Sequence, residues 1–206
     1  LSALGLFGYK ERRCVALVGT EGDPRDVEHD LLQAMAICRA HGGLSLGASP
    51  ARNWHRDRYL HPYMRDDLLE AGIAVETHET AVPWSRVEDV RGDVRRSLEA
   101  VMGAQGRKVH VMAHLSHSYP TGTCIYFILM YPVDPDDPMG QWRPIKAAIC
   151  DAVARHGGTI SHHHGVGLDH KPWLVREKGE LGLRLLRAMR REVDPSGILN
   201  PGKLVD

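Results

Sequence analysis

Three consecutive histidines, His162, His163 and His164, are the side chains best suited to carry chemistry in this chain. Imidazole titrates near neutral pH, so a positioned histidine can accept or donate a proton during a reaction. Because alternate side chains of an extended segment face opposite ways, we expect His162 and His164 to share a face and His163 to point elsewhere. The run lies inside the chain, after a predicted helix, two glycines and a strand-like TIS segment, and this context argues against an expression tag.

A metal site is the alternative chemistry for the same histidines. Neighbours in one extended segment point apart, so zinc would need ligands from elsewhere in the chain. The histidines available elsewhere are His110, His114, His117 and His170, and the one HxxxH pair, His110 and His114, falls in a predicted strand rather than on a helix. The four cysteines form no CxxC pair and predict neither a zinc ribbon nor a disulfide framework. We therefore expect no metal site, and we expect all four thiols to be buried and reduced.

Two further side chains could act on a substrate. Tyr119 lies at the tip of a predicted hairpin, in SHSYPTG, where a phenol beside histidines could serve as an acid or a base. Arg65, in YMRDDLLEAG, has a fixed charge and forked donors that suit a phosphate or a carboxylate. Purely structural roles, as a turn residue for Tyr119 and a surface ion pair for Arg65, stay open on this reasoning.

The elements that must position these residues alternate along the chain. Apolar residues at helical spacing predict four main helices and a short one, over residues 24–41, 63–70, 87–101, 141–156 and 173–193. Strands are predicted over residues 14–19, 73–79, 108–117, 123–131 and 159–161, with a loop over 50–63. In the last helix the predicted apolar positions are Leu181, Leu185 and Met189. This order predicts an α+β fold, with helices packed on one face of a mostly antiparallel sheet.

Composition narrows the classes of function. The 206 residues include 26 basic and 26 acidic side chains, and this balance gives no general attraction to nucleic acid or to a membrane surface. No apolar run reaches the roughly 18 residues of a membrane span. The glycine-containing segments lack the strand–helix context of a dinucleotide-binding loop. The chain starts with neither Met nor a signal-peptide pattern, so we expect it to come from within a longer protein.

Several segments together resemble the FAD-linked oxidase C-terminal domain of the vanillyl-alcohol oxidase superfamily. DPSGILNPGKL, at residues 194–204, is similar to the C-terminal signature of that family. SHSYPTGTCIYF (116–127) and GGTISHHHGVG (157–167) narrow the resemblance to alkyl-dihydroxyacetone-phosphate synthases, and ETAVPWSRVEDV (79–90) is also similar. The resemblance implies a ferredoxin-like substrate or cap domain over residues 1–206, without the N-terminal FAD-binding domain. It also implies that the helix and tail over 173–206 return toward that domain.

The resemblance further implies an activity and roles for the candidate residues. The reaction would be an FAD-dependent exchange of an acyl group for an alkyl group on dihydroxyacetone phosphate, as in ether lipid synthesis. Tyr119 would take the alpha proton of the substrate, and Arg65 would hold its phosphate. The histidine triplet would be catalytic and would stabilise the charged intermediate, while His163, His164 and Asn200 would contact the flavin. The chain alone, which lacks most of the FAD site, is expected to be inactive.

Two other functions remain open. One is an FAD-dependent dehydrogenase of a 2-hydroxy acid such as D-lactate or glycolate. Several such enzymes bind a metal, but Cys124 or Ile125, and His163, stand here where a metal-binding histidine and a glutamate would fall. The other is a non-enzymatic module for a phosphorylated ligand.

For the whole enzyme the expected partner is a small-molecule or lipid phosphate, not nucleic acid. Peripheral membrane association and a homodimer are both open. The expected compartment is the bacterial cytoplasm or, in a eukaryote, the peroxisome; unpaired cysteines fit either one.

Overall fold

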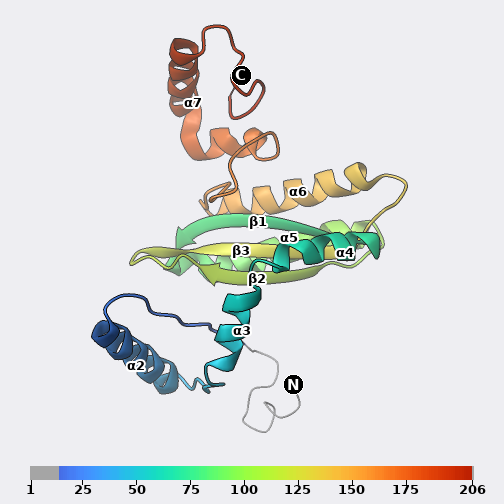
Figure 1. The fold of residues 1–206 in the computed structure, drawn as a ribbon. Coiled ribbons are helices and arrows are strands. Elements are labelled where there is room, and N and C mark those ends of the chain that lie inside the picture. Colours follow the sequence, from blue (N-terminus) through green and yellow to red (C-terminus); the bar gives the residue numbers. More distant parts are fainter. Residues whose placement is uncertain (1–13, 206) are drawn as a thin grey trace. The chain divides into compact units, whose positions relative to one another are not determined.

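A computed structural model describes residues 14–205 of the chain (Figure 1). The chain divides into two compact units, Leu1–Met64 and Arg65–Asp206, and each is described here by itself. Residues 1–13 and Asp206 fall outside the described residues. The prediction that the chain begins inside a longer protein rests on residues in this first segment.

The first unit contains the helices α2 (Pro24–Ala40) and α3 (Ser49–Asp57) and the 3-10 turn η1 (His61–Tyr63). Helix α2 begins as predicted, because the Asp23 carboxylate accepts a hydrogen bond from the backbone N–H of Arg25 at 3.1 Å. The loop predicted over residues 50–63 is wrong, since α3 forms there. Pro50 lies in the first turn of α3, where a helix does not need the N–H that proline lacks.

The strand predicted over residues 14–19 does not form. This segment has no regular secondary structure, and Val15 is 72% exposed. A strand requires a neighbour for its backbone hydrogen bonds, and no strand is present in the described part of this unit. Instead, the segment lines a cavity of about 560 Å³ together with Leu31 and Met35 of α2 and residues 43–51.

The second unit is built on a three-stranded antiparallel sheet in the order β1-β3-β2. The strands are β1 (Ile73–Pro83), β2 (His110–Ser116) and β3 (Gly122–Pro132). Strands β2 and β3 form the predicted hairpin, and β1 runs four residues beyond its predicted end. The short helix α4 (Met64–Glu70) precedes β1, close to its predicted position.

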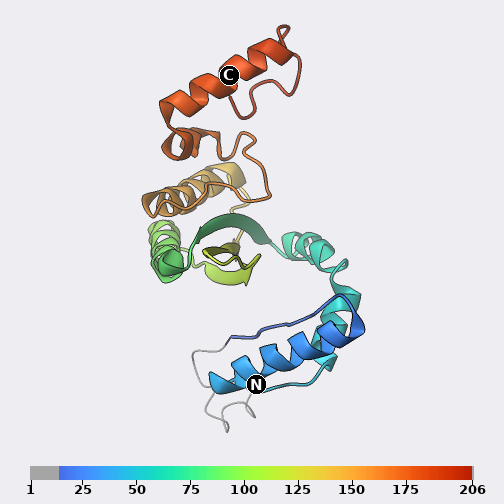
Figure 2. The ribbon, with the colours of Figure 1, turned by 90° about the vertical axis from the view of Figure 1, so that its left-hand side faces the viewer.

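Two helices cover one face of this sheet, α5 (Val87–Ala104), after the turn η2 (Trp84–Arg86), and α6 (Pro138–Arg155). Figure 2 shows them side by side on the same face. Their predicted apolar positions pack with the strands into one core, in which Leu98, Phe127 and Ile149 are fully buried. Burying a side chain of this kind contributes about 1.5–3 kcal/mol. The α+β fold predicted from the sequence is confirmed.

The chain after α6 returns along the free edge of β1. The backbone N–H of Thr159 donates to the carbonyl of Ala81 at 3.2 Å, and that of His162 donates to the carbonyl of Glu79 at 3.0 Å. The predicted strand over 159–161 is not a regular strand, but this extended segment lies where a β-α-β-β-α-β unit has its last strand. The histidine triplet therefore begins at the edge of the sheet.

The last helix, α7 (Leu174–Val193), follows the turn η3 (Lys171–Trp173) and contains a kink at Gly179, where φ is 68°. One side of α7 contributes to a second small core, formed by Ile160, Leu174, Leu183 and Val205. The apolar positions predicted for this helix are not part of that core. Three side chains on the other side are 57–61% exposed, namely Leu181, Leu185 and Met189.

The cysteine prediction holds in part. All four thiols are free, and Cys124 and Cys150 are buried as expected, but Cys14 is exposed and Cys38 is half-buried. The two exceptions belong to the first unit, where no described residue is fully buried. Among the helices formed by residues 14–205, none combines the length and the apolar character needed to cross a bilayer.

Candidate functional site

Glu79 is the centre of a polar cluster on the face of the sheet opposite α5 and α6. The register explains this position, because His78 pairs with Phe127 of the core and Glu79 pairs with Tyr126. Successive residues of a strand point to opposite faces, so Glu79 points away from the core. Its side chain is nevertheless only 4% exposed, because the chain after α6 covers it.

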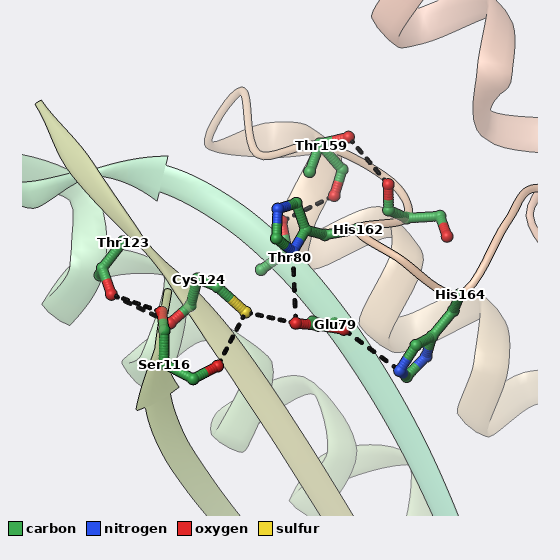
Figure 3. A network of polar contacts seen from close by, with 9 residues as sticks. Glu79, Thr80, Ser116, Thr123, Cys124, Thr159, His162 and His164 are labelled. Atoms are coloured by element: carbon green, nitrogen blue, oxygen red, sulfur yellow. Dashed lines mark hydrogen bonds and ion pairs between the residues drawn. The ribbon is translucent and has the colours of Figure 1, made fainter. Parts of the chain in front are cut away.

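The Glu79 carboxylate contacts three side chains from two other segments (Figure 3). Oε1 accepts a hydrogen bond from the Cys124 thiol at 2.7 Å and lies 3.2 Å from Nδ1 of His162. Oε2 lies 3.2 Å from Nε2 of His164. The first and third histidines of the triplet therefore share one carboxylate, as their alternation predicted.

Glu79 is an anion at neutral pH. Burial alone would raise its pKa, but the hydrogen bonds from Cys124 and His162 and the charges of His164 and His162 outweigh burial and lower the pKa. An ionised carboxylate only accepts hydrogen bonds, so each contacting imidazole must present an N–H to it. Nε2 of His162 and Nδ1 of His164 are then the nitrogens left for other partners.

Cys124 is a donor in this cluster rather than a nucleophile. Burial, followed by the neighbouring Glu79 carboxylate, raises the pKa of its thiol to about 12. The thiolate is the reactive form of cysteine, and it is scarce at neutral pH when the pKa is this high. The thiol proton therefore stays on sulfur and helps to hold Glu79 in place.

The middle histidine, His163, lies beside Glu79 and packs against two neighbouring imidazole rings. Its φ is 60°, and the backbone N–H of His164 donates to the carbonyl of His162 at 2.8 Å, which closes a tight three-residue turn. Its ring stacks on that of His162 at 4.0 Å between centroids and meets the edge of His117 at 4.7 Å. A positive φ is strained for residues with a Cβ, and such strain is concentrated at functional sites.

Tyr119 lies in the hairpin turn between β2 and β3, as predicted. The backbone N–H of Tyr119 donates to the carbonyl of Gly122 at 2.8 Å. The backbone carbonyl of Tyr119 accepts from the indole N–H of Trp84 at 2.9 Å. Its side chain is 44% exposed. His117, two residues before Tyr119, touches both His162 and His163, so the hairpin and the histidine triplet meet in space.

Hydrogen bonds from α7 and from the residue that precedes η3 help to fix the loop that carries the triplet. The Glu177 carboxylate accepts from the backbone N–H of Ile160 at 2.8 Å and from the Thr159 hydroxyl at 3.1 Å. At the other end of the loop, the carbonyl of Gly165 accepts from the Ser161 hydroxyl at 2.6 Å and lies 3.0 Å from Nδ1 of His170. These contacts hold the backbone of the loop on both sides of the imidazoles.

Two predicted site residues are not brought to this cluster. Arg65 lies on α4, is two-thirds exposed, and pairs with the adjacent Asp66 at 3.7 Å. Asn200, with a φ of 46°, is exposed in the C-terminal loop and lines a cavity of about 330 Å³ beside the end of α7. Their predicted roles in binding phosphate and flavin stay predictions.

Sequence reasoning missed Glu79 as a site residue and considered His117 only as a metal ligand. One signal for Glu79 was present, because a charged residue at an alternating position of a predicted strand, within the ETAVPW segment, marks a polar face. The structure also groups Glu79 with His117 and His163, and with Cys124 and His162, with ligand atoms within 4.8 Å of one another. The expectation of no metal site therefore stays a prediction.

The chain is similar to known FAD-linked proteins over most of its length. The family model described as FAD linked oxidases, C-terminal domain, matches residues 3–204. Alkyldihydroxyacetonephosphate synthase of Dictyostelium discoideum is 31% identical over 192 residues, which cover 93% of this chain and 31% of that protein. The uncharacterized FAD-linked oxidoreductase YgcU of Escherichia coli (strain K12) is 29% identical over 156 residues, covering 74% of this chain and 32% of that protein.

The fold also matches a solved structure. A structure of alkyldihydroxyacetonephosphate synthase superposes with a TM-score of 0.66 at 25% identity, and the match covers 86% of this chain and 29% of that one. This chain thus spans about a third of the length of the relatives that it matches.

Proposed function

Because this chain belongs to the family of FAD linked oxidases, C-terminal domain, we propose that it forms the substrate side of a flavoenzyme of the alkyldihydroxyacetonephosphate synthase type. The enzyme would replace the acyl group of acyl-dihydroxyacetone phosphate by a long-chain alcohol and release a fatty acid. The observation that carries the proposal is the contact of His162 and His163 with His117, in the same hairpin turn as Tyr119.

The donor set at this face suits a flavin ring. His163 and His117 are exposed, and their imidazoles offer both flat aromatic surface and N–H donors. The sheet beside them presents Tyr126, Ile128 and Met130 from the same face of β3, all partly exposed. His163 and His164 would hold the ring, which when bound would supply an electron-poor surface for the reacting carbon of the substrate.

The residues of this chain would then move and stabilise charge. Glu79 fixes the orientation of His162 and His164, so Nε2 of the first and Nδ1 of the second have set directions. These nitrogens, protonated, would stabilise the carboxylate of the departing fatty acid. The phenolate form of Tyr119 would take the alpha proton of the substrate, and the resulting phenol would later return it. In this scheme Arg65 would hold the substrate phosphate.

Exposed apolar surface supports a further domain in the complete enzyme. Apolar side chains of α7 are 57–61% exposed on one side of that helix, at Leu181, Leu185 and Met189. Large apolar patches of this kind usually mark an interface with another protein surface. A flavin-binding domain would be the natural occupant, since the matched relatives are about three times longer than this chain. A lipid substrate would also require the enzyme to reach a membrane surface.

The test uses the full-length flavoprotein that contains this chain. The assay measures incorporation of a labelled long-chain alcohol and release of fatty acid, with flavin content determined from absorbance. We expect Tyr119→Phe and Glu79→Gln each to lower turnover by roughly 100-fold or more, with flavin still bound. Tyr59→Phe, at an exposed tyrosine of the first unit, is the control and should leave turnover unchanged. Normal turnover in Tyr119→Phe would refute the role of the phenol.

One alternative is supported by the metal-capable grouping of Glu79 with His117 and His163. It is an FAD-dependent dehydrogenase of a 2-hydroxy acid. Anaerobic addition of D-lactate, glycolate or 2-hydroxyglutarate would bleach the flavin of such an enzyme, whereas a synthase would leave its absorbance unchanged. A non-enzymatic binding module would instead respond to dihydroxyacetone phosphate in a titration without FAD.

A further inference from the structure

A second group of metal-ligating side chains lies on the other face of the sheet, against α6. His78 and Cys150 are fully buried and His170 is 6% exposed. They come from three elements, β1, α6 and the residue that precedes η3. One ligating atom of each lies within 4.8 Å of the other two. His78 is adjacent to Glu79 in sequence but points to the opposite face, so this group is separate from the Glu79 cluster.

The imidazoles of this group lack the partners that buried polar atoms normally have. Neither ring nitrogen of His78 has a hydrogen-bond partner among the described residues, and the same is true of Nε2 of His170. Buried polar atoms without partners are rare and destabilising, and each one calls for an explanation. Three such nitrogens next to a buried thiol indicate that a bound ligand or ion completes the site.

The hydrogen bond of His170 to a backbone carbonyl selects the imidazole tautomer that can bind a metal through Nε2. Nδ1 lies 3.0 Å from the carbonyl of Gly165, and a carbonyl only accepts, so Nδ1 carries the proton. Nε2 then has a free lone pair directed into the buried group. A backbone carbonyl that accepts from the second nitrogen is the usual support for a metal-bound histidine.

A cation lies near this group. The Lys146 ammonium is paired with Glu76 at 3.1 Å, which offsets part of its repulsion of a metal. The Cys150 thiol would lose its proton on binding the ion, as cysteine ligands do.

We propose that His78, Cys150 and His170 bind one transition-metal ion of the zinc class through two nitrogens and one sulfur. Two imidazoles and a thiolate match the ligands that zinc takes in proteins, with a fourth position for water. Zinc–nitrogen and zinc–sulfur bonds of about 2.0–2.3 Å require the three ligand atoms to lie roughly 3.5 Å apart, and here they lie within 4.8 Å of one another. The ion would join β1, α6 and, through His170 and Gly165, the loop of the histidine triplet.

The test is metal binding by the full chain. We expect about one zinc ion per chain by calorimetry, and a rise in the melting temperature of several degrees at saturating zinc. Cobalt(II) reports the ligand type, because a cobalt–thiolate bond gives an intense near-ultraviolet absorption. Cys150→Ser, which preserves side-chain size, should remove this absorption and the thermal shift. Circular dichroism of the metal-free variant shows whether it is folded.

Matched controls separate this site from the groups around Glu79. Cys124→Ser and Glu79→Gln remove ligands of those groups and should keep the cobalt–thiolate absorption. If Cys150→Ser fails to fold, His170→Gln serves as the second variant, and we expect it to weaken zinc binding. The proposal is overturned if the wild-type chain binds no cobalt, or if the absorption survives in folded Cys150→Ser or disappears in folded Cys124→Ser.

Discussion

The side chains of Glu79 and Cys124 meet between β1 and β3, with the thiol sulfur 2.7 Å from the carboxylate oxygen Oε1. The contact pairs a carboxylate that keeps its charge with a thiol that keeps its proton, since the pKa of Glu79 is lowered and that of Cys124 is raised. The same carboxylate contacts His162 and His164. The charge on Glu79, which the Cys124 thiol supports, therefore sets the orientation of these two candidate catalytic rings.

Cys124 should therefore resist alkylation. With a pKa of about 12, only about one thiol in ten thousand is a thiolate at pH 8. Iodoacetamide at pH 8 should modify the exposed Cys14 much faster than Cys124 in the native chain, and peptide mass spectrometry measures both rates. In urea the two rates should converge. Equal rates in the native chain would show that the Cys124 thiol is neither buried nor proton-bound.

The charge of Glu79 should make stability depend on pH in one direction. Its pKa in the folded chain is below the usual value of 4.5, so its contribution is complete above about pH 4.5. That contribution is lost as the pH falls through the lowered pKa. The excess free energy of unfolding of wild type over Glu79→Gln should be largest near pH 7 and shrink below pH 4.5. Urea titrations of both proteins measure it, and a pH-independent difference would contradict the assignment.

Two leucines of the second unit should differ sharply in their contribution to stability. Leu98 on α5 is fully buried, whereas Leu181 on α7 is 61% exposed. Leu98→Ala should cost about 2–5 kcal/mol through lost burial and a residual cavity, and Leu181→Ala should change stability by less than about 0.5 kcal/mol. Urea unfolding of the chain compares them. If Leu181→Ala lowers the free energy of unfolding strongly in the full-length enzyme but not in this chain, that face of α7 lies in a domain interface.

Two glycines make a similar contrast. A Cβ added to Gly122 would overlap the carbonyl oxygen of Val82, so β1 and β3 would have to separate beside the turn that carries Tyr119. A Cβ on Gly103, in the last turn of α5, would meet nothing within 4 Å. Gly122→Ala should destabilise the chain by about 1–3 kcal/mol, and Gly103→Ala should stabilise it by about 0.5–1 kcal/mol. Thermal unfolding distinguishes them, and equal effects would contradict the close approach.

Local patterns in the sequence were enough for most of the second unit. The spacing of Val90, Val94 and Leu98 predicted the buried face of α5, and the Tyr119–Gly122 turn predicted the hairpin, because both depend on neighbours in sequence. The failures concern burial that depends on distant chain. Among the described residues, no strand pairs with residues 14–19. On α7, the predicted apolar positions Leu181, Leu185 and Met189 stay exposed, because no described segment packs against them.

The candidate site divides in the same way. Its histidines were predictable from their types and adjacency, and their alternation predicted that His162 and His164 would share a face. The partner itself, Glu79, is 83 residues from His162, and only the register of β1 places it there. The buried group of His78, Cys150 and His170 left no trace in sequence spacing, because it is assembled from three elements by the folding of the chain.

The segment from Thr159 to His162 has a further effect through its place beside β1. It uses two carbonyls of that strand, at Ala81 and Glu79, without forming a full strand of its own. Free strand edges attract other extended chains and promote aggregation, so covering this margin protects the protein from unwanted pairing. The backbone that carries the imidazoles thus also covers the edge of β1. Displacing it would both misplace the histidines and leave that edge free to pair with another chain.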